Sequence, residues 1–220
     1  MSADLRHIDT WLFDLDNTLY PADSGFMGQI ERRMTDYVER LTGLPRDEAY
    51  RLQKKYLAEY GLTLGGLVEH HNVDPGEFHA IFDDLPLEML AENPRLTAAI
   101  ARLPGRRLIF TNANDVHAHR VLVRLGLADL FDDVFHIALS AYVPKPSRQA
   151  FEAMDAAHGI TPARTAFFED SERNLAPAAE LGMTTVLVGP NAPASTAPFI
   201  RYKTDNLASF LEDALLSEAA

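Results

Sequence analysis

The chain has 220 residues, of which 47% are hydrophobic, so it can bury a substantial core as one domain or as one domain with an insertion. It has no cysteine, which excludes disulfides, thiolate metal sites and cysteine nucleophiles and leaves carboxylate, hydroxyl, amine and imidazole chemistry. Its net charge of −12 disfavours a general nucleic-acid-binding surface, because neutralising phosphates requires clustered Lys and Arg.

The sequence also lacks membrane and export signals. No apolar run approaches the roughly 18 residues that a membrane span requires, and the first ten residues lack the basic patch and apolar stretch of a secretory signal. We therefore expect a soluble, cytoplasmic protein, a monomer or homodimer, whose partner is neither a membrane nor a nucleic acid.

Short apolar runs bounded by turn or helix signals recur along the chain. They predict buried parallel strands at 10–15, 106–111, 165–170 and 184–189, with a weaker fifth strand at 133–139. Amphipathic segments predict helices at 116–127, 147–159, 171–182 and near 205–216, and the last four residues are expected to fray. This alternation predicts an α/β fold, a Rossmann-like parallel sheet with helices on both faces.

The interval from 22 to 92 breaks the alternation. It contains helical patterns and no convincing strand, so we expect an all-helical cap domain at 22–92, inserted into an α/β core domain formed by 1–21 and 93–220. Because the insert follows the first strand and precedes the second, we expect it to leave the core at the carboxyl edge of the sheet, where open α/β folds bind ligands. There it would act as a lid.

The first strand delivers two carboxylates into a turn. Asp14 and Asp16 stand two residues apart in DLDNT, and residues two apart in an extended chain point the same way. Crowded carboxylates repel each other unless a cation, a shared proton or hydrogen bonds compensate. The pair therefore indicates Mg²⁺ binding or acid/base chemistry, with a solvated turn as the alternative.

Hydrogen-bond donors follow the second strand and precede a later helix. Thr111 and Asn112 in FTNAN can both donate to a phosphate, although the same pair could instead cap the next helix. Lys145 stands between Pro144 and Pro146, which restrict where its ammonium group can go. A fixed Lys suits phosphate binding, and the alternative is an ordinary surface charge.

Adjacent acids close the strand expected at 165–170. Buried strands rarely end in this way without a cause, and Glu169 and Asp170 together with Asp14 would supply oxygen ligands for an octahedral Mg²⁺. The alternative is that Asp170 or Ser171 caps the following helix.

Four motifs in this order, DLDNT, FTN, KPS and EDSERN, resemble the signature of the haloacid dehalogenase superfamily and span nearly the whole chain. The resemblance implies a Mg²⁺-dependent phosphohydrolase. It implies that Asp14 is the nucleophile that becomes phosphorylated and that Asp16 protonates the leaving oxygen. Thr111 and Lys145 would hold the phosphoryl group.

The resemblance also implies a set of metal ligands. The Mg²⁺ would be held by Asp14, the backbone carbonyl of Asp16, Asp170 and Glu169. Many family members carry a further Asp four or five residues beyond the last-motif acid, whereas this chain has Asn174 in that region. Asn174 would then support the site indirectly.

A finer resemblance concerns the substrate. The segment WLFDLDNTLYP, the helical insert and EDSERN are most similar to the pyrimidine 5′-nucleotidase branch, which implies a nucleoside 5′-monophosphate as the small phosphorylated partner. Tyr20, Phe26 and Met27 are candidate neighbours of the site.

Other activities remain open on the same core. A phosphatase for sugar phosphates or phosphoglycolate, or a phosphomutase, would keep every catalytic residue and differ only in the cap. A dehalogenase needs neither Mg²⁺ nor a second acid, so Asp16 argues against it. An inactive binding module that retains the fold is the alternative outside enzymes.

Overall fold

The computed structural model of the protein describes residues 3–216, so the fraying expected at 217–220 lies outside it. The chain divides into two compact units, one formed by Met1–Ser24 and Leu90–Ala220 and the other by Gly25–Met89. The second unit therefore begins at 25 rather than 22 and ends at 89 rather than 92, against the bounds expected for the cap. Among the described helices, none has both the length and the apolar character needed to cross a membrane.

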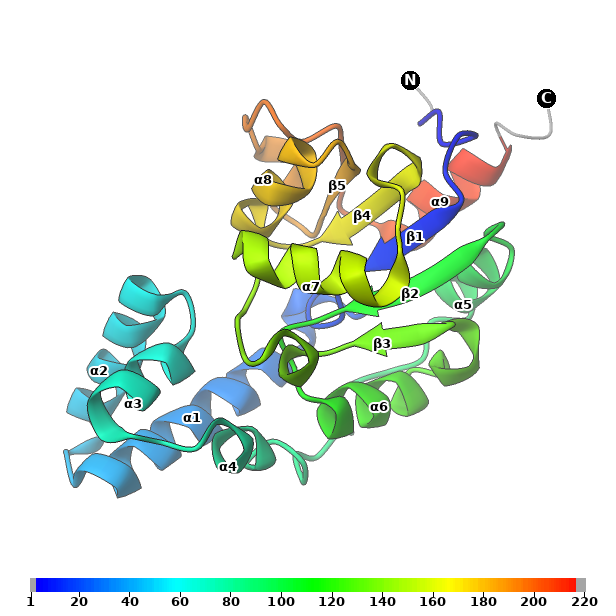
Figure 1. Ribbon diagram of the computed structural model, residues 1–220. Coiled ribbons are helices and arrows are strands. Elements are labelled where there is room, and N and C mark those ends of the chain that lie inside the picture. The colour runs from blue at the N-terminus through cyan, green and yellow to red at the C-terminus, as the bar shows by residue number, and fades with distance from the viewer. Residues whose placement is uncertain (1–2, 217–220) are drawn as a thin grey trace. The chain divides into compact units, whose positions relative to one another are not determined.

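The first unit is built on a six-stranded sheet in which every neighbouring pair is parallel (Figure 1). The strands are β1 Thr10–Phe13, β2 Arg106–Phe110, β3 Asp133–Phe135, β4 Thr165–Glu169, β5 Thr184–Val188 and β6 Tyr202–Thr204. Their order is β3-β2-β1-β4-β5-β6, so the direction of winding switches between β1 and β4. In open α/β sheets, ligands bind at such a switch point, outside the carboxyl ends of the strands.

Helices cover both faces of this sheet (Figure 1). Their bounds are α5 Pro94–Ala101, α6 Asp115–Arg124, α7 Arg148–His158, α8 Glu172–Glu180 and α9 Leu207–Leu216. On one face, Leu12 of β1 and Phe167 of β4 join Phe151 of α7 in a common apolar cluster that also includes α8. On the other face, Phe168 of β4 packs edge-on against Phe210 of α9. The predicted Rossmann-like α/β fold is confirmed.

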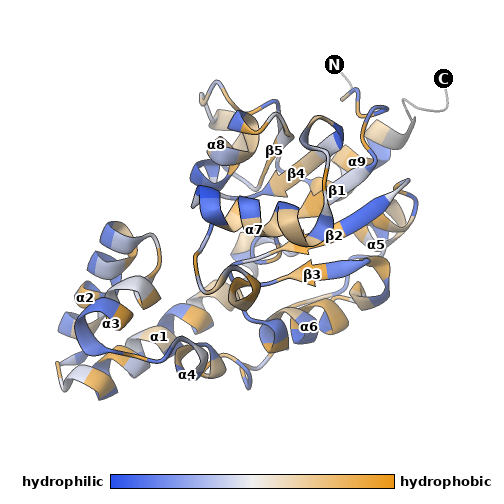
Figure 2. Cartoon of the chain, viewed as in Figure 1, coloured by the Kyte–Doolittle hydropathy of each residue, from blue (hydrophilic) through white to orange (hydrophobic). Residues whose placement is uncertain are grey.

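Burial on both faces explains why the central strands read as unbroken apolar runs. The four residues of β1 are all buried, as are the five of β4. Because adjacent side chains of a strand point to opposite faces, each of these strands feeds two cores. In Figure 2 much of the sheet is apolar, whereas β2 and β3 begin with hydrophilic residues.

The second unit is helical within its described residues. It contains α1 Phe26–Thr42, α2 Arg46–Tyr60, α3 Thr63–His71 and α4 Pro75–Ala80. Close packing of α3 on α2 depends on a glycine, because a Cβ atom added to Gly66 would lie 2.7 Å from Cβ of Tyr56. Two hydrogen bonds between tyrosine hydroxyls and imidazoles, Tyr56 to His71 at 2.9 Å and Tyr60 to His70 at 2.8 Å, join the same two helices.

Candidate active site

A tight turn after β1 carries the first pair of carboxylates. Asp14 follows Phe13 directly, and its backbone N–H donates to the carbonyl of Phe168 in β4 at 2.9 Å. Three residues later Asn17 adopts a left-handed conformation with φ of 62°, which Asn tolerates better than most residues. The chain therefore turns at the carboxyl end of β1, beside the switch point, and leaves Asp14 and Asp16 there.

Lys145 is the centre of a buried charge cluster. Its Nζ donates to Oδ1 of Asp14 at 2.7 Å, to Oε2 of Glu169 at 2.8 Å and to the carbonyl of Phe110 at 2.6 Å. The Lys145 side chain is only 1% exposed. An ammonium group has three donors, and here each has an acceptor at the end of a different strand, β1, β2 or β4.

Asn112 fixes the backbone of Lys145. The side chain Oδ1 of Asn112 accepts from the backbone N–H of Lys145 at 2.8 Å, while Nδ2 donates to the carbonyl of Lys145 at 3.2 Å. The peptide bond that follows, to Pro146, is cis. The phosphate contact that the sequence suggested for Asn112 stays a prediction, and the contact found in the structure is with the KPS motif.

Burial and mutual charge shift the ionisation of this cluster. Burial raises the pKa of Asp14 to about 7, with the charge of Glu169 acting in the same direction and Lys145 opposing both. Burial likewise raises the pKa of Glu169 to about 7 against the opposing charge of Lys145. Burial would lower the pKa of Lys145, but the charges of Asp14 and Glu169 raise it above its ordinary value. When both carboxyl groups are ionised, the negative charge of the cluster thus exceeds what the single ammonium group of Lys145 neutralises.

Asp170 completes a group of acids that fits a metal ion. One carboxylate oxygen from each of Asp14, Glu169 and Asp170 lies within 4.8 Å of the others, and such hard oxygen donors suit Mg²⁺. Asn17 Nδ2 donates to Asp170 at 3.3 Å, and burial raises the pKa of Asp170. A divalent cation would relieve the repulsion among the three acids.

Both oxygens of Glu169 accept hydrogen bonds, as do both oxygens of Asp14. Oε2 of Glu169 accepts from Lys145, and its Oε1 accepts from the backbone N–H of Ser171 at 3.1 Å. Ser171 occupies the N-cap position of α8 without a side-chain capping bond, so neither it nor Asp170 is explained by capping that helix.

Asp16 has different partners from Asp14. Its Oδ1 accepts from the hydroxyl of Tyr20 at 2.8 Å and lies 3.1 Å from Nε2 of His117 in α6. Burial would raise the pKa of Asp16, but the charge and hydrogen bond of His117 and the hydrogen bond of Tyr20 hold it below its ordinary value. The two carboxyl groups of this turn thus differ in ionisation, because the pKa of Asp14 is raised and the pKa of Asp16 is lowered.

Thr111 lies at the end of β2, beside the same cluster. Its backbone N–H donates to Phe135, and its Oγ1 accepts from the backbone N–H of Ala113 at 3.0 Å, which leaves the hydroxyl proton to donate elsewhere. Capping does not explain Thr111 or Asn112, because Asn114 is the N-cap of α6 and accepts from His117 N–H at 2.8 Å.

Some residues of the site were not singled out by the sequence. His117 lies in a helix that was predicted, but its contact with Asp16 spans 101 positions and leaves no local pattern. Thr18 donates to Oδ2 of Asp14 at 3.2 Å, and its place in DLDNT could have suggested this contact. Asn174, by contrast, was named from the sequence as an indirect support of the site; it is buried in α8, and its Oδ1 has no hydrogen-bond partner among the described residues.

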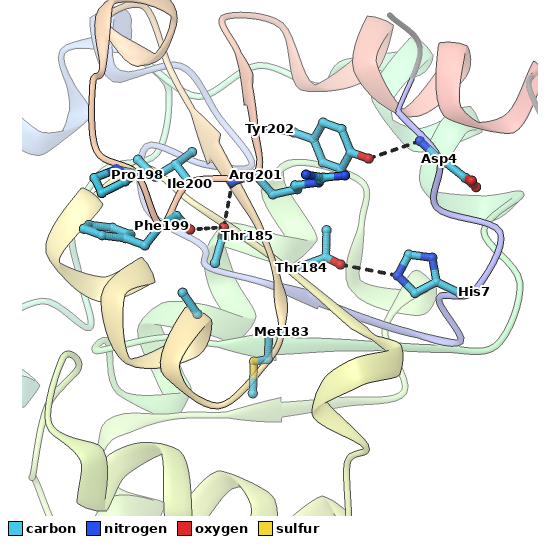
Figure 3. Close-up of a pocket in the computed structure, with 11 residues that line it drawn as sticks. Asp4, His7, Met183, Thr184, Thr185, Pro198, Phe199, Ile200, Arg201 and Tyr202 are labelled. Atoms are coloured by element: carbon cyan, nitrogen blue, oxygen red, sulfur yellow. Dashed lines mark hydrogen bonds between the residues drawn. The ribbon is translucent and has the colours of Figure 1, made fainter.

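A separate pocket of about 540 Å³ lies away from these residues. It is lined by residues where β5 and β6 begin, including Thr184 and Tyr202, so it is at the end of these strands opposite to the carboxyl edge (Figure 3). Tyr202 accepts there from the backbone N–H of Asp4 at 3.2 Å. None of the motif residues lines this pocket.

Comparison with known proteins decides the family. The sequence profile described as haloacid dehalogenase-like hydrolase matches residues 8–182 of the chain, which contain all four motifs. The chain belongs to the haloacid dehalogenase-like hydrolases. This membership confirms the superfamily indicated by the motifs, and the strand-end acids and Lys145 lie within the matched region.

Several known proteins are similar to this hydrolase. The chain is 30% identical over 193 residues to Phosphate metabolism protein 8 of Saccharomyces cerevisiae, covering 80% of this chain and 60% of that protein. A HAD phosphatase from Thermococcus onnurineus has 19% identity and a TM-score of 0.64, covering 94% of this chain and 98% of that one. L-2-haloacid dehalogenase from Xanthobacter autotrophicus has 16% identity and a TM-score of 0.58, covering 97% and 100%. The two structures support the fold.

Proposed function

We propose that this hydrolase is a Mg²⁺-dependent phosphomonoesterase that forms a phospho-aspartyl intermediate on Asp14, with a pyrimidine nucleoside 5′-monophosphate as its substrate. The observation that carries the proposal is the buried Lys145, which donates to both Asp14 and Glu169 where β1 and β4 end. A fixed ammonium group beside a strand-end carboxylate suits a reaction in which negative charge accumulates around phosphorus.

The first step transfers the phosphoryl group to the protein. A carboxylate oxygen of Asp14 attacks phosphorus, the bond from phosphorus to the ester oxygen breaks, and Asp16 gives its proton to the leaving oxygen. The loose transition state of phosphoryl transfer is helped mainly by alignment and by positive charge near the equatorial oxygens. Lys145 supplies such charge, and the hydroxyl of Thr111 supplies a donor.

The second step regenerates the enzyme. Water attacks the phosphorus of phospho-Asp14, Asp16 takes a proton from that water, and inorganic phosphate leaves with Asp14 restored. Mg²⁺, held by Asp14, Asp170 and the carbonyl of Asp16, would supply further positive charge at the phosphoryl oxygens. Glu169, whose oxygens accept from Lys145 and Ser171, would keep the ammonium group in place.

Phosphatase chemistry is preferred to dehalogenation because of Asp16. Halide leaves carbon without needing a proton, whereas an alkoxide leaving group needs one, and Asp16 is held as a second carboxylate by Tyr20 and His117. The name of the yeast relative, which refers to phosphate metabolism, points the same way. We propose in addition that the unit Gly25–Met89 supplies the nucleoside contacts and acts as a lid.

The test is phosphate release from a panel of monoesters, with Mg²⁺ and with EDTA. The panel contains UMP, CMP, AMP, phosphoglycolate and sugar phosphates. We expect Mg²⁺-dependent release with preference for UMP and CMP. Mg²⁺-dependent release with another preference would keep the mechanism and replace the substrate, and no release from any ester would contradict the phosphatase proposal in favour of a mutase, a dehalogenase or a binding role.

A further inference from the structure

Two donors anchor Asp16 through one of its oxygens. The hydroxyl of Tyr20 and Nε2 of His117 both approach Oδ1, at 2.8 Å and 3.1 Å, so neither contact uses Oδ2. Tyr20 is 2% exposed and His117 is 4% exposed, whereas Asp16 is only partly buried. The carboxyl group thus has one oxygen fixed by buried side chains and a second oxygen outside those contacts.

The two donors reach Asp16 from separate parts of the fold. Tyr20 stands four residues along the same turn, and His117 comes from the first turn of α6. The capping contact of Asn114 with the backbone of His117 fixes where this helix begins. Oδ1 can only accept both in the ionised carboxylate and in the acid form protonated on Oδ2, so Nε2 of His117 carries the hydrogen in this contact. Asp16 is therefore held in one orientation from two sides.

The geometry points to His117 and Tyr20 as positioning residues that hold Oδ1 of Asp16, so that Oδ2 carries the proton given to the leaving oxygen. This inference rests on the proposed phosphatase function. An oxygen that faces two donors cannot also carry a proton without losing one of them, so the acid form of Asp16 is protonated on Oδ2. As the ester bond breaks, this proton passes to the leaving oxygen, and Oδ2 later takes one from the attacking water.

A positioning role has a signature that general destabilisation lacks. A nucleoside alkoxide must be protonated as it leaves, whereas p-nitrophenolate departs readily without a proton. Misplacing the acid should therefore harm the alkyl ester and spare the aryl ester. The ratio of kcat/KM for the two esters measures this effect, because kcat/KM reports the steps up to departure of the first product and not the later hydrolysis of phospho-Asp14.

The experiment compares UMP with p-nitrophenyl phosphate in Mg²⁺ for the whole chain and four variants. His117→Leu removes the imidazole donor, Tyr20→Phe removes only the hydroxyl, and His117→Gln keeps an amide donor. His119→Leu is the matched control, because His119 lies in the same helix and is exposed. Thermal unfolding of each variant shows which of them fold.

We expect His117→Leu and Tyr20→Phe to lower kcat/KM for UMP by about tenfold or more, a part of the roughly 10²–10⁴-fold that a positioned acid contributes. The same variants should stay within about twofold of the original chain on p-nitrophenyl phosphate, and His117→Gln should recover most of the UMP activity. Equal losses on both esters in His117→Leu and Tyr20→Phe, or no loss on either ester in these two variants, would overturn the positioning role while leaving the phosphatase proposal intact. Failure of the original chain to hydrolyse either ester would overturn both.

Discussion

Lys145 and Asp14 are joined by a 2.7 Å hydrogen bond between Nζ and Oδ1, and both side chains are buried. Moving an ion from water into the protein interior costs on the order of several kcal/mol, even after the protein relaxes. The ion pair recovers this cost only where the remaining hydrogen-bond donors and acceptors are also satisfied. Lys145 meets this condition, because Glu169 and the carbonyl of Phe110 accept its other two hydrogens. The pair thus belongs to a network whose members depend on one another.

Replacing Lys145 by Met should destabilise the fold strongly. The substitution leaves the carboxylates of Asp14 and Glu169 buried beside each other without their common cation, and breaking such a buried pair costs about 3–5 kcal/mol. Urea unfolding at neutral pH measures the loss. The control is Lys55→Met, at an exposed position in α2, which should change stability by less than about 0.5 kcal/mol. Equal effects of the two substitutions would contradict the network.

Replacing Asp14 by Asn should abolish phosphate release while the chain still folds. The amide cannot attack phosphorus, and it keeps the shape of the carboxyl group beside Lys145 and Thr18. Because the pKa of Asp14 is raised to about 7, removing its charge costs little at neutral pH in the absence of metal. Phosphate release and thermal unfolding are measured on the same sample, and ordinary turnover by this variant would rule out Asp14 as the nucleophile.

Alanine at two glycines of the helical unit should have opposite effects. At Gly66 the added methyl group meets Tyr56, so Gly66→Ala should destabilise the α2–α3 contact by about 1–3 kcal/mol. At Gly28 in α1 the nearest atom is the end of the Arg32 side chain at 3.4 Å, so the higher helix propensity of Ala should stabilise by up to about 1 kcal/mol. Denaturant unfolding of both variants checks the signs, and a neutral Gly66→Ala would contradict the close packing.

Strong local patterns account for what the sequence predicted of the fold. The five expected strands are present, and four of them, β1, β2, β4 and β5, lie inside the sheet, where strands need apolar runs. The sixth strand, Tyr202–Thr204, was missed because it is a three-residue edge strand without a buried residue, whereas the edge strand β3 contains the buried Phe135. Helix Pro94–Ala101 was also missed, although Asn93 caps it and Pro94 begins it, because its eight residues show little more than two turns of pattern.

The site was predictable where its residues sit at strand ends. Asp14, Thr111 and Glu169 follow or close strands that are recognisable locally, so parallel pairing brings them to one edge of the sheet. The contact of His117 with Asp16 depends on how α6 packs, which no spacing in the sequence records. The use of Asn112 to hold Lys145 was equally hidden, since an Asn after a strand looks the same whichever group it binds.

In the metal-free protein, Asp14 and Glu169 should contribute less to stability as the pH rises from about 4 to about 7. The pKa values of Asp14 and Glu169 are both raised to about 7, so the folded chain holds these protons more tightly than the unfolded chain does. A raised pKa adds stability that is complete below the unfolded value and is lost as the pH passes the folded value. Unfolding is measured in EDTA at a series of pH values. The free energy of unfolding of Asp14→Asn should rise relative to that of the original chain over this interval. If the two curves of unfolding free energy against pH are parallel, the pKa of Asp14 is not raised in the folded chain.

Mg²⁺ should reverse that loss by binding to the acids that cause it. The ion competes with protons for Asp14 and Asp170, so its stabilising effect should grow as the pH rises from about 5 to about 7. A concentration 100 times the dissociation constant adds about 2.7 kcal/mol to the free energy of unfolding, which is readily seen in thermal unfolding without substrate. Asp170→Asn should lose most of this stabilisation, whereas Asp129→Asn, at an exposed position, should keep it. If both variants respond to Mg²⁺ like the original chain, the ion binds elsewhere, and the positive charge at the strand ends comes from Lys145 alone.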